Sequence, residues 1–438
     1  MLSSQLLPLK LSCFFLLLFA CQSDGTSSSN KNKELDLLEA TQLENDLLYE
    51  EASLWTFEEY YRSTYAKELP LIDNTSIDSF IDPDDIENID ARILSLDKIY
   101  PDFFKNKMRA LSMYRLMLSP NYASLVVCVR KNQNEQESLL INYTLDGEII
   151  DWELVAYDEI AESMSRVEAK ISEYILKVNH ASWWNNLEVN QEIFSFDPHG
   201  KIEKIRSINL NKEIENFYAV VDVMDQLDLH LLDVKPELIT SKELNKANDT
   251  LIVVIPELVY EDEFMFDLSA HIVLVHPHSG VISHKYFAET DICEWISDAI
   301  ELRKITIDTA PYTLNEKETA FGIRTSFVGQ SRVNPINNEI LSLFRKKGNK
   351  LEKILDHLDS KYFSGNIDAE CEEEYYEEKR ILQMQEDKSY GLRDILVKTS
   401  ITESSVFLIE NGECVTEERV STSEDFLKFD GQEYVWEQ

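Results

Sequence analysis

The sequence predicts a mainly β protein with a helical N-terminal segment, an α+β chain whose strands form antiparallel meanders. From about residue 121 onward, short runs rich in Val, Ile, Leu, Tyr and Phe alternate with turn residues. Six of the eleven glycines stand at such turns, where a positive φ is needed that glycine adopts without strain. Their spacing is irregular, so we expect two β-rich modules, built as sandwiches or as an irregular propeller.

The N-terminus predicts export and a lipid anchor. Leu11–Ala20 is an apolar run, too short to cross a bilayer and typical of a signal peptide. The run ends in Leu18-Phe19-Ala20-Cys21, which resembles the lipobox of bacterial lipoproteins. The resemblance implies a signal peptide over residues 1–20 and a lipid on Cys21. An ordinary signal peptide with a chance cysteine is the alternative.

The residue after the lipidated cysteine and the tether that follows complete the predicted anchor. In lipoproteins, Asp after the cysteine usually marks retention in the inner membrane. Gln22 stands there instead, so the resemblance implies a cell-envelope protein at the outer membrane, facing the periplasm. Residues 21–33 are small and polar and predict a flexible tether.

Residues 34–118 are predicted to be an acidic helical segment. A stripe of Leu and aromatic side chains at helical spacing runs through its first part and ends at Phe57 and Tyr61. We favour a helix that packs on the same chain over a helix that binds a partner. Asp82 and Pro83 then predict a second helix, because Asp is a good N-cap and Pro fits the first helical position.

The turns locate the hairpins of the two β modules. LLINYTLDGEIIDW places two apolar runs around Asp-Gly, which is a strong local signal for a hairpin. The first module is predicted over 119–212 and the larger one over 213–438, with a single helix near 291–303, where Ile and Trp recur at helical spacing. The glycines of the six hairpin turns are Gly147, Gly200, Gly280, Gly348, Gly412 and Gly431.

The charge of the chain restricts its partners. Lys plus Arg number 42 and Asp plus Glu number 81, so the net charge is −39. Such a surface repels the phosphates of nucleic acids, which excludes nucleic-acid binding as the main role. The acidic run CEEEYYEEKR at 371–380 has two readings, a cation-binding cluster or a solvated strand face whose charges discourage edge pairing. We favour the strand face.

Four cysteines remain once the signal peptide is removed and Cys21 carries lipid. Cys128 lies in an apolar run and is predicted to be a buried thiol. Cys371 and Cys414 lie in polar, acidic segments. Exposed free thiols are not expected in an oxidising compartment, so we predict a disulfide between these two.

HIVLVHPHSGVISH, residues 271–284, holds four of the eight histidines and raises the question of a metal site. Strand alternation separates His271 from His276. His276, His278 and His284 can meet near the turn, as the metal ligands of a hydrolase. We favour a plain hairpin turn without metal.

Motifs for nucleotide binding, for a zinc protease and for a serine nucleophile are absent from the sequence. We therefore expect no cofactor and no assignable catalytic residue. The sequence favours a binding or structural component of the envelope, with an envelope protein as its partner, over an enzyme. The alternative is the metal-dependent hydrolase that would use the histidine turn.

An ordered set of short fragments in the later half resembles an uncharacterised family of bacterial envelope proteins. The likeness covers roughly residues 251–437, and it implies a cysteine near Cys371 and another at Cys414. It implies no activity. The fragments are DTAPY (308–312), TAFGIR (319–324), SRVNP (331–335), EILSLF (339–344), GLRDILVK (391–398), GEC (412–414) and LKFDGQEY (427–434).

Overall fold

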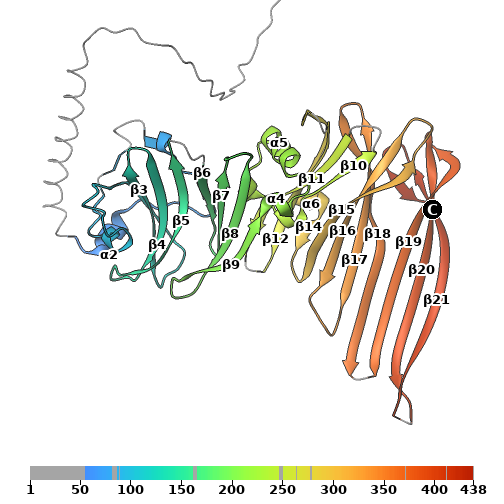
Figure 1. Ribbon diagram of the computed structural model, residues 1–438. Helices are drawn as coiled ribbons and strands as arrows, with labels where there is room; N and C mark the ends of the chain where they lie inside the picture. The colour runs from blue at the N-terminus through green and yellow to red at the C-terminus, as the bar shows by residue number, and fades with distance from the viewer. Residues whose placement is uncertain are drawn as a thin grey trace, which may run out of the picture. The chain divides into compact units, whose positions relative to one another are not determined.

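The chain folds into two sheets linked by short helices (Figure 1), which confirms the mainly β fold class. The helices and 3-10 turns are α2 (Phe57–Ser63), η1 (Ile77–Phe80), α3 (Leu96–Ile99), α4 (Leu210–Glu213), α5 (Phe217–Leu227), η3 (Leu231–Asp233), η4 (Pro236–Leu238) and α6 (Thr290–Cys293). The computed structural model describes residues 55–80, 86–87, 89–160, 165–245, 250–262, 264–276, 279–369, 371–410 and 412–437.

The first sheet, sheet A, is an antiparallel meander in which β2 to β9 lie in chain order and β1 pairs with β6. β5 and β6 are joined through a single residue pair, Tyr157 with Val167, yet side chains from both halves of the sheet share one core. Its strands are β1 (Leu71–Asp73), β2 (Arg109–Leu116), β3 (Ala123–Asn132), β4 (Glu135–Tyr143), β5 (Ile149–Glu159), β6 (Ser165–Ile171), β7 (Ile175–Ser182), β8 (Glu188–Phe196) and β9 (Ile202–Asn209).

The second sheet, sheet B, is antiparallel except where β13 meets β18 through the parallel pair Lys285 and Lys350. Its strands are β10 (Thr240–Asn245), β11 (Thr250–Glu261), β12 (Phe266–Val275), β13 (Ile282–Ala288), β14 (Trp295–Ser297), β15 (Ile300–Thr313), β16 (Thr319–Gly329), β17 (Ile336–Lys347), β18 (Lys350–Ala369), β19 (Glu372–Ser389), β20 (Leu392–Leu408), β21 (Cys414–Phe429) and β22 (Tyr434–Trp436).

The predicted turn glycines hold the conformation expected of them, because all six have positive φ. Gly147 shows why no other residue fits. Its φ is 90°, and a Cβ built on it would come within 2.6 Å of the Phe57 ring. The β4–β5 turn is therefore shaped to let α2 pack closely on it.

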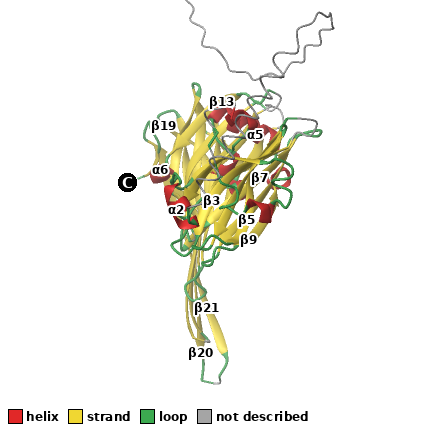
Figure 2. Cartoon of the chain, turned by 90° about the vertical axis from the view of Figure 1, so that its left-hand side faces the viewer, coloured by secondary structure: helices red, strands yellow, loops and turns green. Residues whose placement is uncertain are grey.

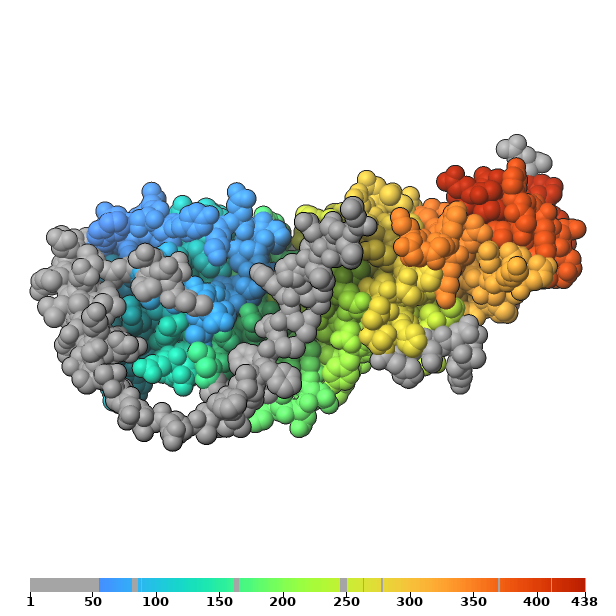
Figure 3. Space-filling view, turned by 90° about the horizontal axis from the view of Figure 1, so that it is seen from above, coloured from blue at the N-terminus to red at the C-terminus, as the bar shows by residue number. Residues whose placement is uncertain are grey.

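Helix α2 packs on sheet A of the same chain, as the sequence predicted for the described end of the stripe. A capping box begins the helix, with the Thr56 side chain and Glu59 each satisfying the other's backbone N–H. The ring of Phe57 lies 4.9 Å from that of Tyr143, and the Tyr61 hydroxyl donates to the Leu116 carbonyl at 3.2 Å. Figure 3 shows the early part of the described chain, in blue, lying beside the teal strands of sheet A.

The prediction that 34–118 is helical is wrong over much of its described part, which includes β1, β2 and the turn at residues 91–95. Asp82 and Pro83 lie outside the described residues. Asp90 explains why no helix continues through this region. Its buried carboxylate accepts from the N–H of Arg92 at 2.8 Å, and such a local bond holds the backbone in a turn that competes with a helix.

The predicted helix at 291–303 is also wrong. Helix α6 stops at Cys293, because Glu294 adopts a left-handed conformation with φ 55°. Trp295 and Ser297 are then buried while Ile296 is exposed, which is strand alternation. β14 pairs with β12, and β15 pairs with β16. This strand pairing outweighs the helical preference that the spacing of Ile and Trp indicates.

Strand β12 separates two cores of sheet B by simple alternation, as the sequence predicted. Ile272 and Leu274 enter the core that also holds Cys293 and Trp295, which we call the α6 core. Val273 and Val275 enter the core on the other face, built with α5, which we call the α5 core.

The α5 core also ties the two sheets together. It contains Val189 and Ile208 from β8 and β9 beside Val253 of β11, so it draws on both sides of the predicted boundary at 212 and 213. A buried ion triad lies at the same junction. Glu261 of β11 accepts from Lys177 of β7 at 2.5 Å and also pairs with Lys235. From Thr56 to Gln438 the chain is one compact unit.

Candidate functional site

The alternative metal site would use His276, His278 and His284, and in the described part of the chain the first and last of these make separate contacts. The backbone N–H of His276 donates to the Val281 carbonyl at 3.1 Å. The Nε2 of His284 lies 3.1 Å from the carbonyl of Gly348, on a different hairpin. His278 lies outside the described residues. Among those that are described, no group of three His, Cys, Asp or Glu side chains is placed to hold a metal ion.

His271 lies on β12, on the face of Val273, and is engaged elsewhere. Its Nε2 lies 2.7 Å from Oε2 of Glu257 on β11, and its ring packs on Phe287 with centroids 4.8 Å apart. Strand alternation therefore separates His271 from the turn, as the sequence predicted.

A small cavity in the α6 core brings a thiol close to a histidine. The cavity has a volume of about 30 Å³, enough for about one water molecule. His357 lies at its wall with Nδ1 2.5 Å from Asp356, and the thiol of Cys293 donates to the Leu268 carbonyl at 3.3 Å. Burial raises the pKa of Cys293, which keeps it a thiol, whereas a nucleophilic cysteine needs a thiolate. Cys293 therefore packs as a small apolar side chain of the α6 core.

Four polar side chains from three of the quoted fragments meet in one network. Arg324 of TAFGIR donates to Asp308 of DTAPY at 2.7 and 2.8 Å and to Glu339 of EILSLF at 2.9 Å. Tyr312, also of DTAPY, donates to Asp308 at 2.8 Å. Burial opposes ionisation of Asp308, but hydrogen bonds from Ala310 and Arg324 outweigh it and lower its pKa. Since all three guanidinium nitrogens have partners, the network is a structural brace.

The outer part of strands β18 to β21 forms an exposed surface. We call residues 361–379 and 400–423, which form it, the acidic blade. Figure 2 shows β20 and β21 running out past the other strands as a narrow sheet. In the described part of the blade, Cys371 is the one buried side chain. Both faces of this sheet are therefore open to solvent.

The blade is strongly acidic and carries a groove. Its sequence holds twelve Asp and Glu residues against three Lys and Arg. On one face an open groove of about 640 Å³ crosses the four strands, with Glu374, Tyr376, Glu403 and Glu417 among its lining residues. This agrees with the preferred interpretation of CEEEYYEEKR as the solvated face of a strand.

The two long edges of the blade differ. Along β18, the backbone N–H groups of Gly365 and Ile367 donate to carbonyls of residues 335 and 333, so that edge is covered. Along β21, one side pairs with β20 from Cys414 to Leu427, while β22 covers the other side only from Leu427 to Phe429. No described strand pairs with the outer side of β21 between Val415 and Asp425. That edge presents free backbone donors and acceptors.

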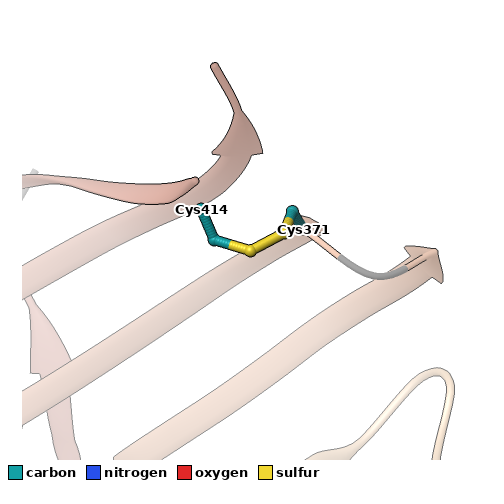
Figure 4. The surroundings of a disulfide bond; sticks show 2 residues. All are labelled: Cys371 and Cys414. Atoms are coloured by element: carbon teal, nitrogen blue, oxygen red, sulfur yellow. A yellow bond between two sulfur atoms is a disulfide. The ribbon is translucent and has the colours of Figure 1, made fainter. Parts of the chain in front are cut away.

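A disulfide closes the tip of the blade (Figure 4). It joins Cys371, just before β19, to Cys414 at the start of β21, with their Cα atoms 5.4 Å apart. This is the pair that the sequence predicted. Cys128 and Cys293 are buried free thiols, and burial raises the pKa of Cys128 to about 12.

The lipid attachment residue Cys21 lies outside the described residues. In the part of the chain that is described, no helix is long and apolar enough to cross a membrane. The acidic blade was only partly visible in the sequence. Its acidity was clear, but its open edge depends on pairings between strands far apart in the chain.

The sequence was compared with known proteins, and neither the protein-family models nor the curated proteins gave a match. The likeness of residues 251–437 to envelope proteins therefore stays a prediction.

Proposed function

We propose that the chain is a lipid-anchored protein of the bacterial cell envelope, held through Cys21 at the outer membrane on its periplasmic side. The apolar run before Leu18-Phe19-Ala20-Cys21 and the polar tether after it support this proposal. A multiply acylated cysteine anchors a protein stably where a single chain does not. We propose further that the chain is a binding component, which the lack of sequence motifs for nucleotide binding, for a zinc protease and for a serine nucleophile favours over an enzyme.

The binding surface in this proposal is the acidic blade, and its partner is an extended basic segment of another envelope protein. The open outer edge of β21 between Val415 and Asp425 is the observation that carries the proposal. An exposed sheet edge accepts an added strand through its backbone hydrogen bonds. The acidic side chains of the blade repel a second copy of this chain and attract lysine and arginine.

The blade proposal is tested with a ten-residue peptide of alternating Lys and Val, measured by fluorescence anisotropy. We expect it to bind at low salt and to weaken as salt rises, because exposed charges are screened. The same peptide with alternate backbone amides methylated should not bind, because it cannot complete the added strand. Equal binding of the methylated peptide would show that electrostatic attraction alone accounts for binding, and it would refute the strand-addition proposal.

A matched pair of variants locates the contact. Glu417→Gln with Glu418→Gln removes two charges from the blade, and Glu213→Gln with Glu215→Gln removes two from near α4, outside the blade. The first pair should weaken peptide binding about tenfold, if the two charges together contribute about 1.4 kcal/mol, while the second should not change it. Equal weakening of peptide binding by both pairs would show that the blade is not the binding surface.

The anchor is tested separately by fractionation of cells. Cys21→Ser should move the protein from the membrane fraction to the soluble fraction, since the cysteine is the lipid acceptor of the proposal. A Cys21→Ser protein that stays with the membrane while its precursor is fully processed would refute the lipid anchor and leave the blade proposal untouched.

A further inference from the structure

A second surface is a cleft beside the C-terminal end of α5, and its lining residues lie outside the blade. The cleft has a volume of about 690 Å³, within the size range of sites for small molecules. Val273 and Leu351 are buried and form an apolar part of its lining. Phe287 also lines it and is 51% exposed, so an aromatic ring is open to whatever enters.

Two lysines stand side by side in this cleft. Lys285 of β13 and Lys350 of β18 are direct partners in the one parallel contact between these strands. Like charges placed opposite each other on neighbouring strands destabilise a sheet. In a chain of net charge −39 a carboxylate partner would be easy to supply, as Asp356 does for Lys353 at 2.6 Å.

Neither lysine has an ion-pair partner among the residues that the structure describes. Two carboxylates, Asp228 and Glu257, also line the cleft, but neither forms a described ion pair with a lysine of the cleft, and that of Glu257 lies 2.7 Å from the ring of His271. The two ammonium groups are therefore placed to share an anion that comes from outside the chain. Such an anion would relieve their mutual repulsion.

The aromatic lining of the cleft indicates the kind of uncharged group that the ligand carries. Phe287 packs against His271, and Glu257 holds that imidazole from the other side, so the aromatic wall has a defined orientation. A flat apolar group can lie on this wall while its charged end reaches the lysines. The combination of a paired positive charge and an exposed aromatic ring selects for an amphipathic small molecule.

We propose that this cleft binds a small organic anion, whose charged group lies between Lys285 and Lys350 and whose apolar body lies against Phe287. The proposal is independent of the blade and of the lipid anchor. It assigns a role to His271, which lines this cleft, as the residue that orients the aromatic wall.

Titration calorimetry on the full chain tests this proposal with three water-soluble probes. Phenyl phosphate carries both the anion and the flat body, inorganic phosphate carries the anion alone, and phenol carries the body alone. We expect phenyl phosphate to bind one site per chain, more tightly than either of the others. If phenol binds as well as phenyl phosphate, or if none of the three binds at low salt, the proposal is overturned.

Variants then assign the site. Lys285→Gln and Lys350→Gln should each weaken phenyl phosphate binding about tenfold, the size expected when one contact to a charged group is lost. Lys285→Arg should restore most of the affinity because it keeps the charge. Phe287→Ala should reduce phenyl phosphate to the affinity of inorganic phosphate.

Lys304→Gln is the matched control, because Lys304 is an exposed lysine of β15 that does not line the cleft. It changes the net charge of the chain by the same amount as Lys285→Gln. It should leave binding unchanged. If it weakens binding as much as the cleft variants do, the effect is one of overall charge and the assignment of the site is wrong.

Discussion

Removing the disulfide at the tip of the blade should loosen the blade without unfolding the rest of the protein. Cys371 and Cys414 are separated by 43 residues, a loop that contains all of β19 and β20. Closing a loop of this length lowers the entropy of the unfolded chain by roughly 13 cal/mol/K, which is about 4 kcal/mol at 25 °C. The variant that carries Cys371→Ser and Cys414→Ser should lose up to this amount of stability.

The loss should be local, because the blade lacks a core while the inner ends of its strands do not. Ile395, Val397 and Leu427 hold the inner parts of β20 and β21 in a core, whereas the described blade buries only Cys371. The part of a structure with few buried contacts opens first. About 4 kcal/mol corresponds to roughly three decades in the opening equilibrium.

Hydrogen exchange followed by mass spectrometry measures this opening segment by segment. In the serine variant, exchange should accelerate by up to about three decades at 372–379 and 400–423, on the basis of the same energy. Strands β3 and β4, in the other sheet, should not change. Reductant should accelerate exchange in the natural protein and have no effect on the variant. Uniform acceleration across both sheets, or none in the blade, would refute this reasoning.

Three further predictions concern the body of the protein. Glu261→Gln leaves two lysines without their carboxylate at the junction of the sheets, and it should cost about 3–5 kcal/mol in chemical denaturation; a cost below about 1 kcal/mol would contradict this. The hydrogen bond to Asp356 raises the pKa of His357. This hydrogen bond therefore stabilises the fold fully below about pH 6.5. The stabilisation is lost as the pH rises through the pKa that His357 has in the folded protein. The difference in stability between the natural protein and His357→Gln should shrink as the pH rises through this range. A difference that grows with pH would contradict the prediction. Arg324→Lys cannot keep both bonds to Asp308, and should lower the melting temperature by a few degrees; an unchanged melting temperature would show that the brace is dispensable.

The elements that the sequence predicted well depend on local physics. A turn glycine is needed where φ is positive, and Gly147 and Gly412 satisfy that need regardless of what surrounds them. The alternation along β12 is equally local, since Val273 and Leu274 must point to opposite sides of any strand.

The errors arose where two local patterns compete and a distant partner decides between them. In 291–303 the Ile and Trp residues fit both a helix and a strand, and the available edges of β12 and β16 select the strand. Thr240–Asn245 shows no clear strand pattern, yet it forms β10 because β11 offers it a partner. The brace around Arg324 could not be predicted either, since its members come together only through the pairing of β15, β16 and β17.

In the blade, the strands lack the usual alternation of apolar and polar residues, and this absence indicates a sheet without a buried face. A strand with one buried face alternates apolar and polar residues, but Glu372–Glu374 and Glu417–Arg419 are polar at every position. A sheet without a buried face gains little from the hydrophobic effect, so other interactions must hold it. Tyr362 packs on Tyr376 and Phe363 on Tyr375 across the strands, and the disulfide restrains the tip. The same acidic residues leave the blade without a core and, in the function that we propose, repel a second copy from its open edge and attract a basic partner.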